Sequence, residues 1–238
     1  MEGPTAWLRE AWARLQPTGA LTLDGWVAGA AAAAVALLLV PALWRWSRVG
    51  VTVVHELGHA VVGIAAGRRF TGLVLRPDMS GHTVTVGAAR GPGLVAATWA
   101  GYPAPAVVGA VLARLAVGGW SPTLLGVSTA LLLGALTRAR SLYTAGVVAA
   151  LATLNGSLWW WGASQVQGAA VLAVGCFLLA GAWRHLGAVA AHPTPQSDPG
   201  LLARLTGVPR ALWIASHAAA LGLATWWLAR GLGALVAR

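Results

Sequence analysis

His55-Glu56-Leu57-Gly58-His59 lies inside the apolar run Val49–Ala66, and this stretch decides both the fold and the chemistry. On an α-helix, residues four apart share one face, so His55 and His59 can direct both imidazoles at one metal ion. Glu56 lies about 100° round the helix, where its carboxylate can reach a water bound to that metal. Ionisable groups are costly in hydrocarbon and mark functional sites where they occur. The stretch therefore predicts a zinc (Zn2+) hydrolase that works inside a membrane.

The same five residues have a structural interpretation, in which the three polar side chains satisfy one another or neighbouring helices without a metal. The chain has six histidines and three glutamates among 238 residues. Random placement of these residues gives about 0.002 expected matches to the H-E-x-x-H pattern. Because a polar cluster in lipid needs a reason to be there, the pattern favours the metal site.

The composition is that of a polytopic membrane protein, with 58% hydrophobic and 9% charged residues. Several apolar stretches fall below the usual span length of about 20 residues. We therefore expect an all-α membrane protein with six to seven transmembrane helices in a single domain, residues 25–238. The candidate stretches are Gly25–Trp44, Val49–Ala66, Gly93–Ala113, Pro122–Leu136, Leu142–Trp161, Gly168–Trp183 and Ala211–Ala229.

All sixteen basic residues are arginines, and they are spread through short loops. A nucleic-acid site would need them gathered on one face, so we expect no nucleic-acid partner. With seven spans, most arginines fall on the side that holds the N-terminus. The positive-inside rule then places the N-terminus on the cytoplasmic side of the membrane. We expect a multi-pass protein of the cell membrane, here a bacterial plasma membrane. If one of the seven spans did not cross the membrane, the orientation of all the spans after it would be reversed.

The first 24 residues predict a helix that lies in the membrane interface and contacts lipids. Acids and prolines precede the first apolar run, which is unlike a signal peptide. Trp7, Leu8, Trp12 and Leu15 recur on one helical face, and the charged residues lie elsewhere. The sole cysteine, Cys176, excludes an intrachain disulfide and a cysteine metal cage.

A β-hairpin is expected directly after the metal-binding helix, which Gly67 would terminate at its C′ position. Phe70–Arg76 and His82–Val86 have β-branched character, and the turn-forming sequence Pro77–Gly81 joins them. One interpretation is a connector that shields the helix end. The other is an edge strand within Phe70–Val86 that pairs with a single-span membrane protein substrate held in extended form.

A catalytic zinc usually takes three protein ligands, so one ligand is missing beside the two histidines. Asp198 is attractive because it lies at the mouth of a helix, on the side predicted to hold the C-terminal end of the His55–His59 helix. Ser197 or Asp198 also suits the cap of a short helix with Pro199 in its first turn and Gly207 at its end. The open candidates for the third ligand are Asp78, His82, Asp198, His185, His192 and His217.

At this point the chain resembles the site-2-protease superfamily, and most closely its compact M50B-like bacterial branch. The resemblance runs from about Val49 to Trp213. The motifs that carry it are His55-Glu56-Leu57-Gly58-His59-Ala60, the following hairpin, Ala100-Gly101-Tyr102, Ser197-Asp198-Pro199 and Leu205-Thr206-Gly207-Val208-Pro209. It implies a zinc-dependent intramembrane endopeptidase with His55 and His59 as ligands and Glu56 as the base. It also implies an aspartate ligand from a later helix, for which Asp198 is the matching position.

The chain departs from the better-studied members in two ways. Their aspartate belongs to an Asp-Gly motif preceded by an Asn-Pro element, whereas here it is Asp198-Pro199-Gly200 and Asn155 is the sole asparagine. No PDZ-like domain occurs within these residues. Asn155 suits either a donor to transition-state charge or a bond to a neighbouring helix. The alternative function is a non-proteolytic transporter, scaffold or inactive homologue that retains a metal site, although no internal symmetry of the transporter kind is visible.

Overall fold

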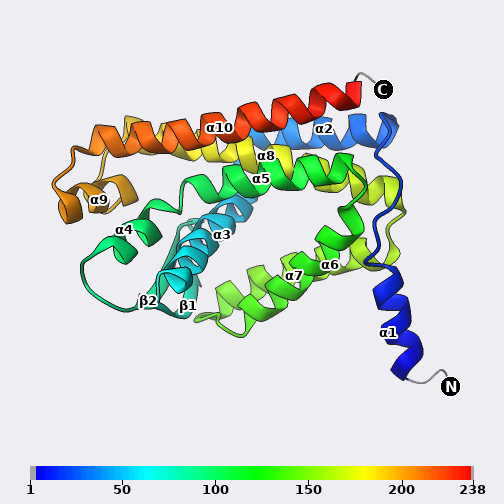
Figure 1. The fold of residues 1–238 in the computed structure, drawn as a ribbon, viewed down its shortest axis with the longest axis horizontal. Helices are drawn as coiled ribbons and strands as arrows, with labels where there is room; N and C mark the ends of the chain where they lie inside the picture. The colour runs from blue at the N-terminus through cyan, green and yellow to red at the C-terminus, as the bar shows by residue number, and fades with distance from the viewer. Residues whose placement is uncertain (1–3, 237–238) are drawn as a thin grey trace.

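Four long helices lie side by side in the upper layer of the molecule in Figure 1: α2 (Gly25–Leu39), α5 (Pro103–Val117), α8 (Ser164–Ala191) and α10 (Arg210–Val236). The structure, a computed structural model, describes residues 4–236. Small residues allow α5 and α8 to approach closely, since a Cβ at Gly109 would lie 2.4 Å from the carbonyl oxygen of Gly175. The buried alanines of α5, from Ala106 to Ala116, complete this core.

Helix α3 (Pro41–Ala65) carries the H-E-x-x-H stretch and meets α2 at an angle of 101°. The expected spans Gly25–Trp44 and Val49–Ala66 leave a break at residues 45–48, and the structure corrects its position to Val40. Val40 is extended, with φ −80° and ψ 115°, because a residue before proline avoids the helical region, and Pro41 then begins the next helix. Arg45 and Arg48 therefore belong to the first turns of α3 itself.

The predicted span Gly93–Ala113 is also bent, by 56°, into α4 (Pro92–Trp99) and α5. Within residues 4–236, three helices are long and apolar enough to cross a membrane: α7 (Leu142–Trp161), α8 and the Arg210–Gly233 part of α10. The two bent pairs raise the number to five, and α6 (Ser121–Leu136) is a shorter apolar helix. These numbers are somewhat lower than six to seven but compatible with them, and they confirm the all-α polytopic fold class.

The predicted hairpin is confirmed: β1 (Arg69–Leu75) pairs antiparallel with β2 (Gly81–Val86), with a bulge between Phe70 and Gly72. Gly67 ends α3 with a φ of +76°, as expected. Leu73 and Leu75 of β1 pack against Val53 of α3 and Val148 of α7. The hairpin is thus fixed between α3 and α7, below the upper layer (Figure 1).

Helix α9 (Asp198–Thr206) begins and ends where the sequence predicted. Ser197 is the N-cap, Pro199 lies in the first turn, and Gly207 ends the helix with a φ of +74°. The helix packs on α4 and α10 through the fully buried Leu202. This position brings the N-terminal end of α9 over the middle of α3.

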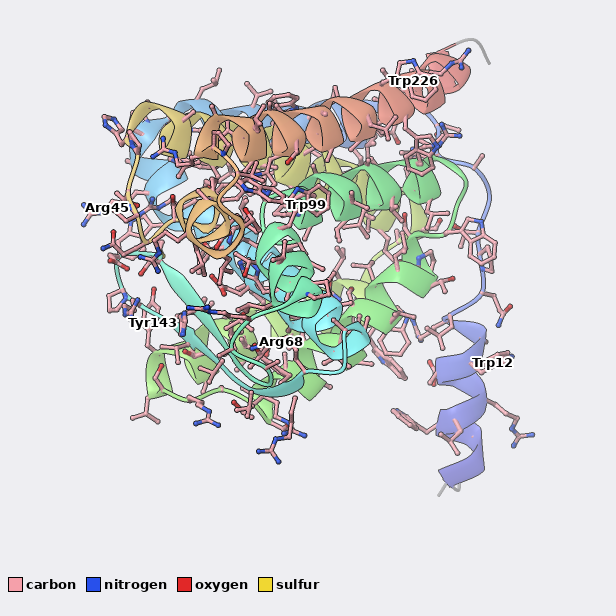
Figure 2. All side chains as sticks on the ribbon, turned by 60° about the vertical axis from the view of Figure 1, so that its left-hand side comes forward. Trp12, Arg45, Arg68, Trp99, Tyr143 and Trp226 are labelled. Atoms are coloured by element: carbon pink, nitrogen blue, oxygen red, sulfur yellow. The ribbon has the colours of Figure 1, made fainter. Side chains whose placement is uncertain are left out.

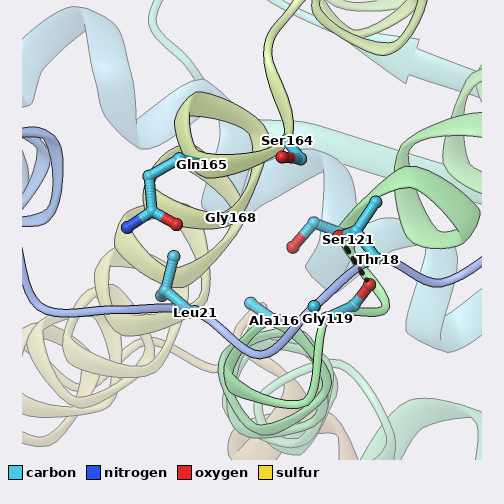
Figure 3. Close-up of a pocket in the computed structure, with 9 residues that line it drawn as sticks. Thr18, Leu21, Ala116, Gly119, Ser121, Ser164, Gln165 and Gly168 are labelled. Carbon is cyan, nitrogen blue, oxygen red and sulfur yellow. Dashed lines mark hydrogen bonds between the residues drawn. The ribbon is translucent and has the colours of Figure 1, made fainter.

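Helix α1 (Pro4–Ala13) projects from the bundle, and Trp12 on it is labelled in Figure 2. Trp7, Leu8 and Trp12 are 58%, 58% and 68% exposed. The position of this segment in the membrane interface stays a prediction, and so does the domain boundary at residue 25. Residues 1–3 and 237–238 lie outside the described residues. A small space between residues 18–21 and α8 (Figure 3) has a volume of about 10 Å³, which is room for at most one water.

Candidate metal centre

Three ligand atoms from α3 and α9 converge on one point. The Nε2 atoms of His55 and His59 lie 3.1 Å apart. Oδ2 of Asp198 is 3.1 Å from the first and 3.3 Å from the second. A tetrahedral zinc with bonds of about 2.0–2.1 Å holds its ligands about 3.3 Å apart. The three atoms therefore have the spacing of one triangular face of a zinc site.

The hydrogen bonds around the three ligands suit a cation. His59 Nδ1 lies 2.7 Å from the carbonyl oxygen of Ala97. The ring therefore donates its N–H to that oxygen and presents the lone pair of Nε2 to the site. Among the described residues, Asp198 Oδ2 is buried and, apart from its contacts with the two imidazole nitrogens, has no hydrogen-bond partner. A buried oxygen without a partner is costly, and a bound cation would remove this cost.

Glu56 lies beside His55, His59 and Asp198, but its carboxylate is not part of the group of atoms that could hold one metal ion. Its side chain is 5% exposed and faces the hairpin, where the hydroxyl of Thr83 lies 2.8 Å from Oε2. A Cβ at Gly81 would lie 2.6 Å from Cγ of Glu56. Strand β2 thus holds the carboxylate, and the glycine at its first position leaves room for it.

Two glycines bring the bend between α4 and α5 close to the histidines. A Cβ at Gly101 would lie 2.4 Å from Cε1 of His59 and 2.7 Å from Cε1 of His55. A Cβ at Gly58 would lie 2.4 Å from the Cβ of Ala104. The backbone at Gly101 therefore packs directly against both rings, which no other residue type would permit without movement.

Aromatic rings support His55 on the side of α10. The ring of Tyr102 meets His55 edge-on, with centroids 4.9 Å apart, and His217 lies 5.3 Å behind Tyr102. His217 is fully buried, and its Nε2 is 3.1 Å from the carbonyl oxygen of Trp99. His217, an open candidate for the third ligand, is therefore a packing partner of Tyr102 rather than a neighbour of the ligand triangle.

The other open candidates do not join the triangle within the part of the chain that the structure describes. Asp78, His82 and His192 are exposed, and His185 packs edge-on against Trp44 with ring centroids 5.5 Å apart. Asn155 donates its amide to Leu125, Ser128 and Thr129 of α6 at 2.7, 3.0 and 2.7 Å. Asn155 therefore joins α7 to α6. Of its two expected roles, this is the bond to a neighbouring helix and not the donor to transition-state charge.

Sequence reasoning did not identify Thr83, Gly101 or Tyr102 as parts of the site. Thr83 looked like one of several β-branched residues in a strand. Gly101 and Tyr102 were quoted only within a family motif. For Gly101 and Tyr102 one signal was available, their position directly before Pro103. A proline there indicates the start of a new helix, and a glycine indicates that another segment packs closely against the backbone.

A cleft of about 970 Å³ opens onto the ligand triangle. Its walls come from α3, α4, α8 and α9 and from β2, all of whose residues from Gly81 to Thr85 line it. Figure 2 labels Arg68, which lines this cleft, and Trp99, the last residue of α4. A cleft of this volume has room for a short extended peptide segment as well as for a small molecule.

Comparison with known proteins identifies the family. Residues 28–229 match the Peptidase M50B-like family, a range that contains Glu56 and the three converging residues His55, His59 and Asp198. A search of curated proteins and a search of solved structures gave no match. The match covers most of the chain and confirms the resemblance to the site-2-protease superfamily. This multi-pass membrane protein belongs to the Peptidase M50B-like family of metallopeptidases.

Proposed function

We propose that the protein is a zinc-dependent intramembrane endopeptidase that hydrolyses peptide bonds of membrane-spanning substrates. The observation that carries this proposal is the triangle of His55, His59 and Asp198 with sides of 3.1, 3.1 and 3.3 Å, beside a buried glutamate in an open cleft. These three residues would hold the zinc. When bound, zinc lowers the pKa of water and polarises a carbonyl group.

Glu56 is the proton carrier in this proposal. Its carboxylate takes a proton from the attacking water and passes it to the nitrogen of the leaving amine. The Thr83 hydroxyl 2.8 Å from Oε2 holds one carboxylate oxygen, so that Oε1 remains for the proton. Burial of the side chain keeps competing water away from this transfer.

Strand β2 is the proposed docking edge for the substrate. Within residues 4–236 the sheet has two strands, so β2 pairs with β1 on one side and turns its other side to the cleft. Proteolysis needs an extended backbone, and an extended segment can add to a sheet edge by main-chain hydrogen bonds. A single-span protein that unwinds beside Phe70–Val86 would meet Glu56 and the ligand triangle together.

Two further statements stay predictions: the cell membrane as the location and the cytoplasmic side for the N-terminus. The multi-pass character itself follows from the candidate spans and the family. Zinc as the metal is supported by the donor set, two imidazoles and a carboxylate, which is common in zinc hydrolases.

The test is cleavage of single-span peptides by the purified protein in proteoliposomes with zinc, together with metal analysis of the same samples. Wild type should hold about one zinc and cut at least one peptide of the panel. Glu56→Gln should keep its zinc and lose cleavage by several orders of magnitude. Stoichiometric zinc without cleavage in wild type would favour the non-proteolytic alternative. Loss of zinc in Glu56→Gln would make Glu56 a ligand.

A further inference from the structure

A second group of unpaired polar atoms lies in the same cleft, two helical turns before His55. Arg48 of α3 and His185 of α8 both line the cleft. Among the described residues, Arg48 Nε and His185 Nε2 are buried without a hydrogen-bond partner. The seven residues from Arg48 to His55 correspond to about 10 Å along the helix. These two atoms are not part of the ligand triangle.

The geometry of Arg48 leaves donors free for a ligand. One of its terminal nitrogens donates to the carbonyl oxygen of Asp78, and Nε donates to no described group. His185 lines the same cleft as Arg48, and Trp44 packs edge-on against its ring. A neutral imidazole can donate through Nε2, and a guanidinium binds a carboxylate with strong, charge-assisted hydrogen bonds.

At this end of the cleft the charged groups are Arg48, Arg76 and Asp78, whereas the other two acids that line the cleft, Glu56 and Asp198, belong to the candidate metal centre. The nearby acid is Asp78, which Arg48 and Arg76 both face. Its carboxyl accepts hydrogen bonds from the hydroxyl and backbone N–H of Ser80 at 2.7 and 3.0 Å, and these bonds lower the pKa of Asp78. One exposed carboxylate thus faces two guanidinium groups. The Nε of Arg48 is buried without a partner although the residue as a whole is partly exposed, so an anion is the fitting ligand here.

We infer that Arg48 and His185 form a subsite that binds a carboxylate of the substrate, and this inference rests on the proposed function. An extended chain advances about 3.3 Å per residue, so the distance of about 10 Å corresponds to about three residues. The subsite therefore selects an Asp or Glu side chain about three residues from the scissile bond. Arg48 lies toward the beginning of β2, which is to one side of the scissile bond. The selected acid therefore lies on that side of the bond and not on the other.

Binding tests this subsite separately from catalysis. In the zinc-loaded Glu56→Gln protein, a glutamine-containing single-span peptide is compared with versions in which one Gln at a time is replaced by Glu. We expect one position, or two adjacent ones, at which Glu tightens binding about tenfold. Adding Arg48→Gln should abolish that preference and leave both the binding of the all-Gln peptide and the zinc content unchanged. His185→Gln should weaken the same preference.

Arg45→Gln is the matched control, since Arg45 lies one turn earlier on α3, is exposed, and stacks on Trp46 at 5.8 Å. It should keep the full preference for Glu. Peptides with free and amidated C-termini distinguish a side-chain carboxylate from a terminal one, and a preference for the free terminus alone would overturn the side-chain assignment. Equal binding of acidic and amide peptides, or equal weakening of both by Arg48→Gln, would overturn the subsite. Cleavage by wild type is scored independently, so discrimination without cleavage refutes only the proposed function.

Discussion

The hydroxyl of Thr83 lies 2.8 Å from Oε2 of Glu56 and 2.7 Å from the backbone carbonyl oxygen of the same residue. A residue of the hairpin therefore fixes the carboxylate that is proposed to carry the proton. The strand that is proposed to receive the substrate and the side chain that is proposed to act on it are thus joined by one contact.

Removing this hydroxyl should slow catalysis without removing metal. Thr83→Val keeps the shape and the strand preference of the side chain, and Thr83→Ser keeps the hydroxyl. A hydrogen bond to a charged group contributes about 1.5–3 kcal/mol, which corresponds to about ten- to a hundredfold in rate. We expect kcat to fall by that amount in Thr83→Val, with near-normal kcat in Thr83→Ser and unchanged zinc in both. Equal kcat in Thr83→Val and wild type would show that Glu56 needs no such support.

The third ligand can be decided by a pair of substitutions. Asn replaces Asp with nearly the same shape, and the cap position belongs to Ser197, so Asp198→Asn should leave folding largely intact. It removes the negative charge from the triangle and should sharply reduce zinc occupancy and cleavage. His82→Ala should do neither, since His82 is exposed on β2. Full activity in Asp198→Asn, with metal lost in His82→Ala, would reverse the assignment.

Gly101 offers a test of the packing beneath the histidines. Gly101→Ala places a Cβ within 2.4–2.7 Å of both imidazole rings, so the rings must move. We expect a large drop in zinc affinity, measured by competition with a chelator, while circular dichroism still reports a helical protein. Gly222→Ala in α10 is the control, because a Cβ there meets no atom within 4 Å. Unchanged zinc affinity in Gly101→Ala would mean that the rings tolerate the displacement.

Proline at Val84 tests the docking edge. Val84 lies in the middle of β2, opposite Gly72, and lines the cleft. Proline removes a backbone N–H from the strand. Cleavage of a membrane substrate should fall more than zinc content does. Turnover equal to that of wild type would reduce Phe70–Val86 to a connector.

The local parts of the structure could be predicted because local rules govern them. The spacing of His55 and His59 places both on one helical face whatever the rest of the chain does. Gly67 and the Pro77–Gly81 turn predict the hairpin, and Pro199 and Gly207 bound α9. The break at Val40 obeys the same kind of rule, the restriction on a residue before proline, but the apolar run through Trp44 concealed it.

Tertiary structure alone decided which distant residues meet. The sequence offered Asp198, His82 and four other candidates for the missing ligand, and only the packing of α9 on α4 and α10 brings Oδ2 of Asp198 within 3.3 Å of both imidazoles. The same is true of Thr83 and Gly101, whose roles depend on how closely the hairpin and the α4–α5 bend approach α3. Helical periodicity and turn chemistry act over a few residues, whereas a ligand triangle depends on side-chain packing between segments far apart in the chain, which no local pattern encodes.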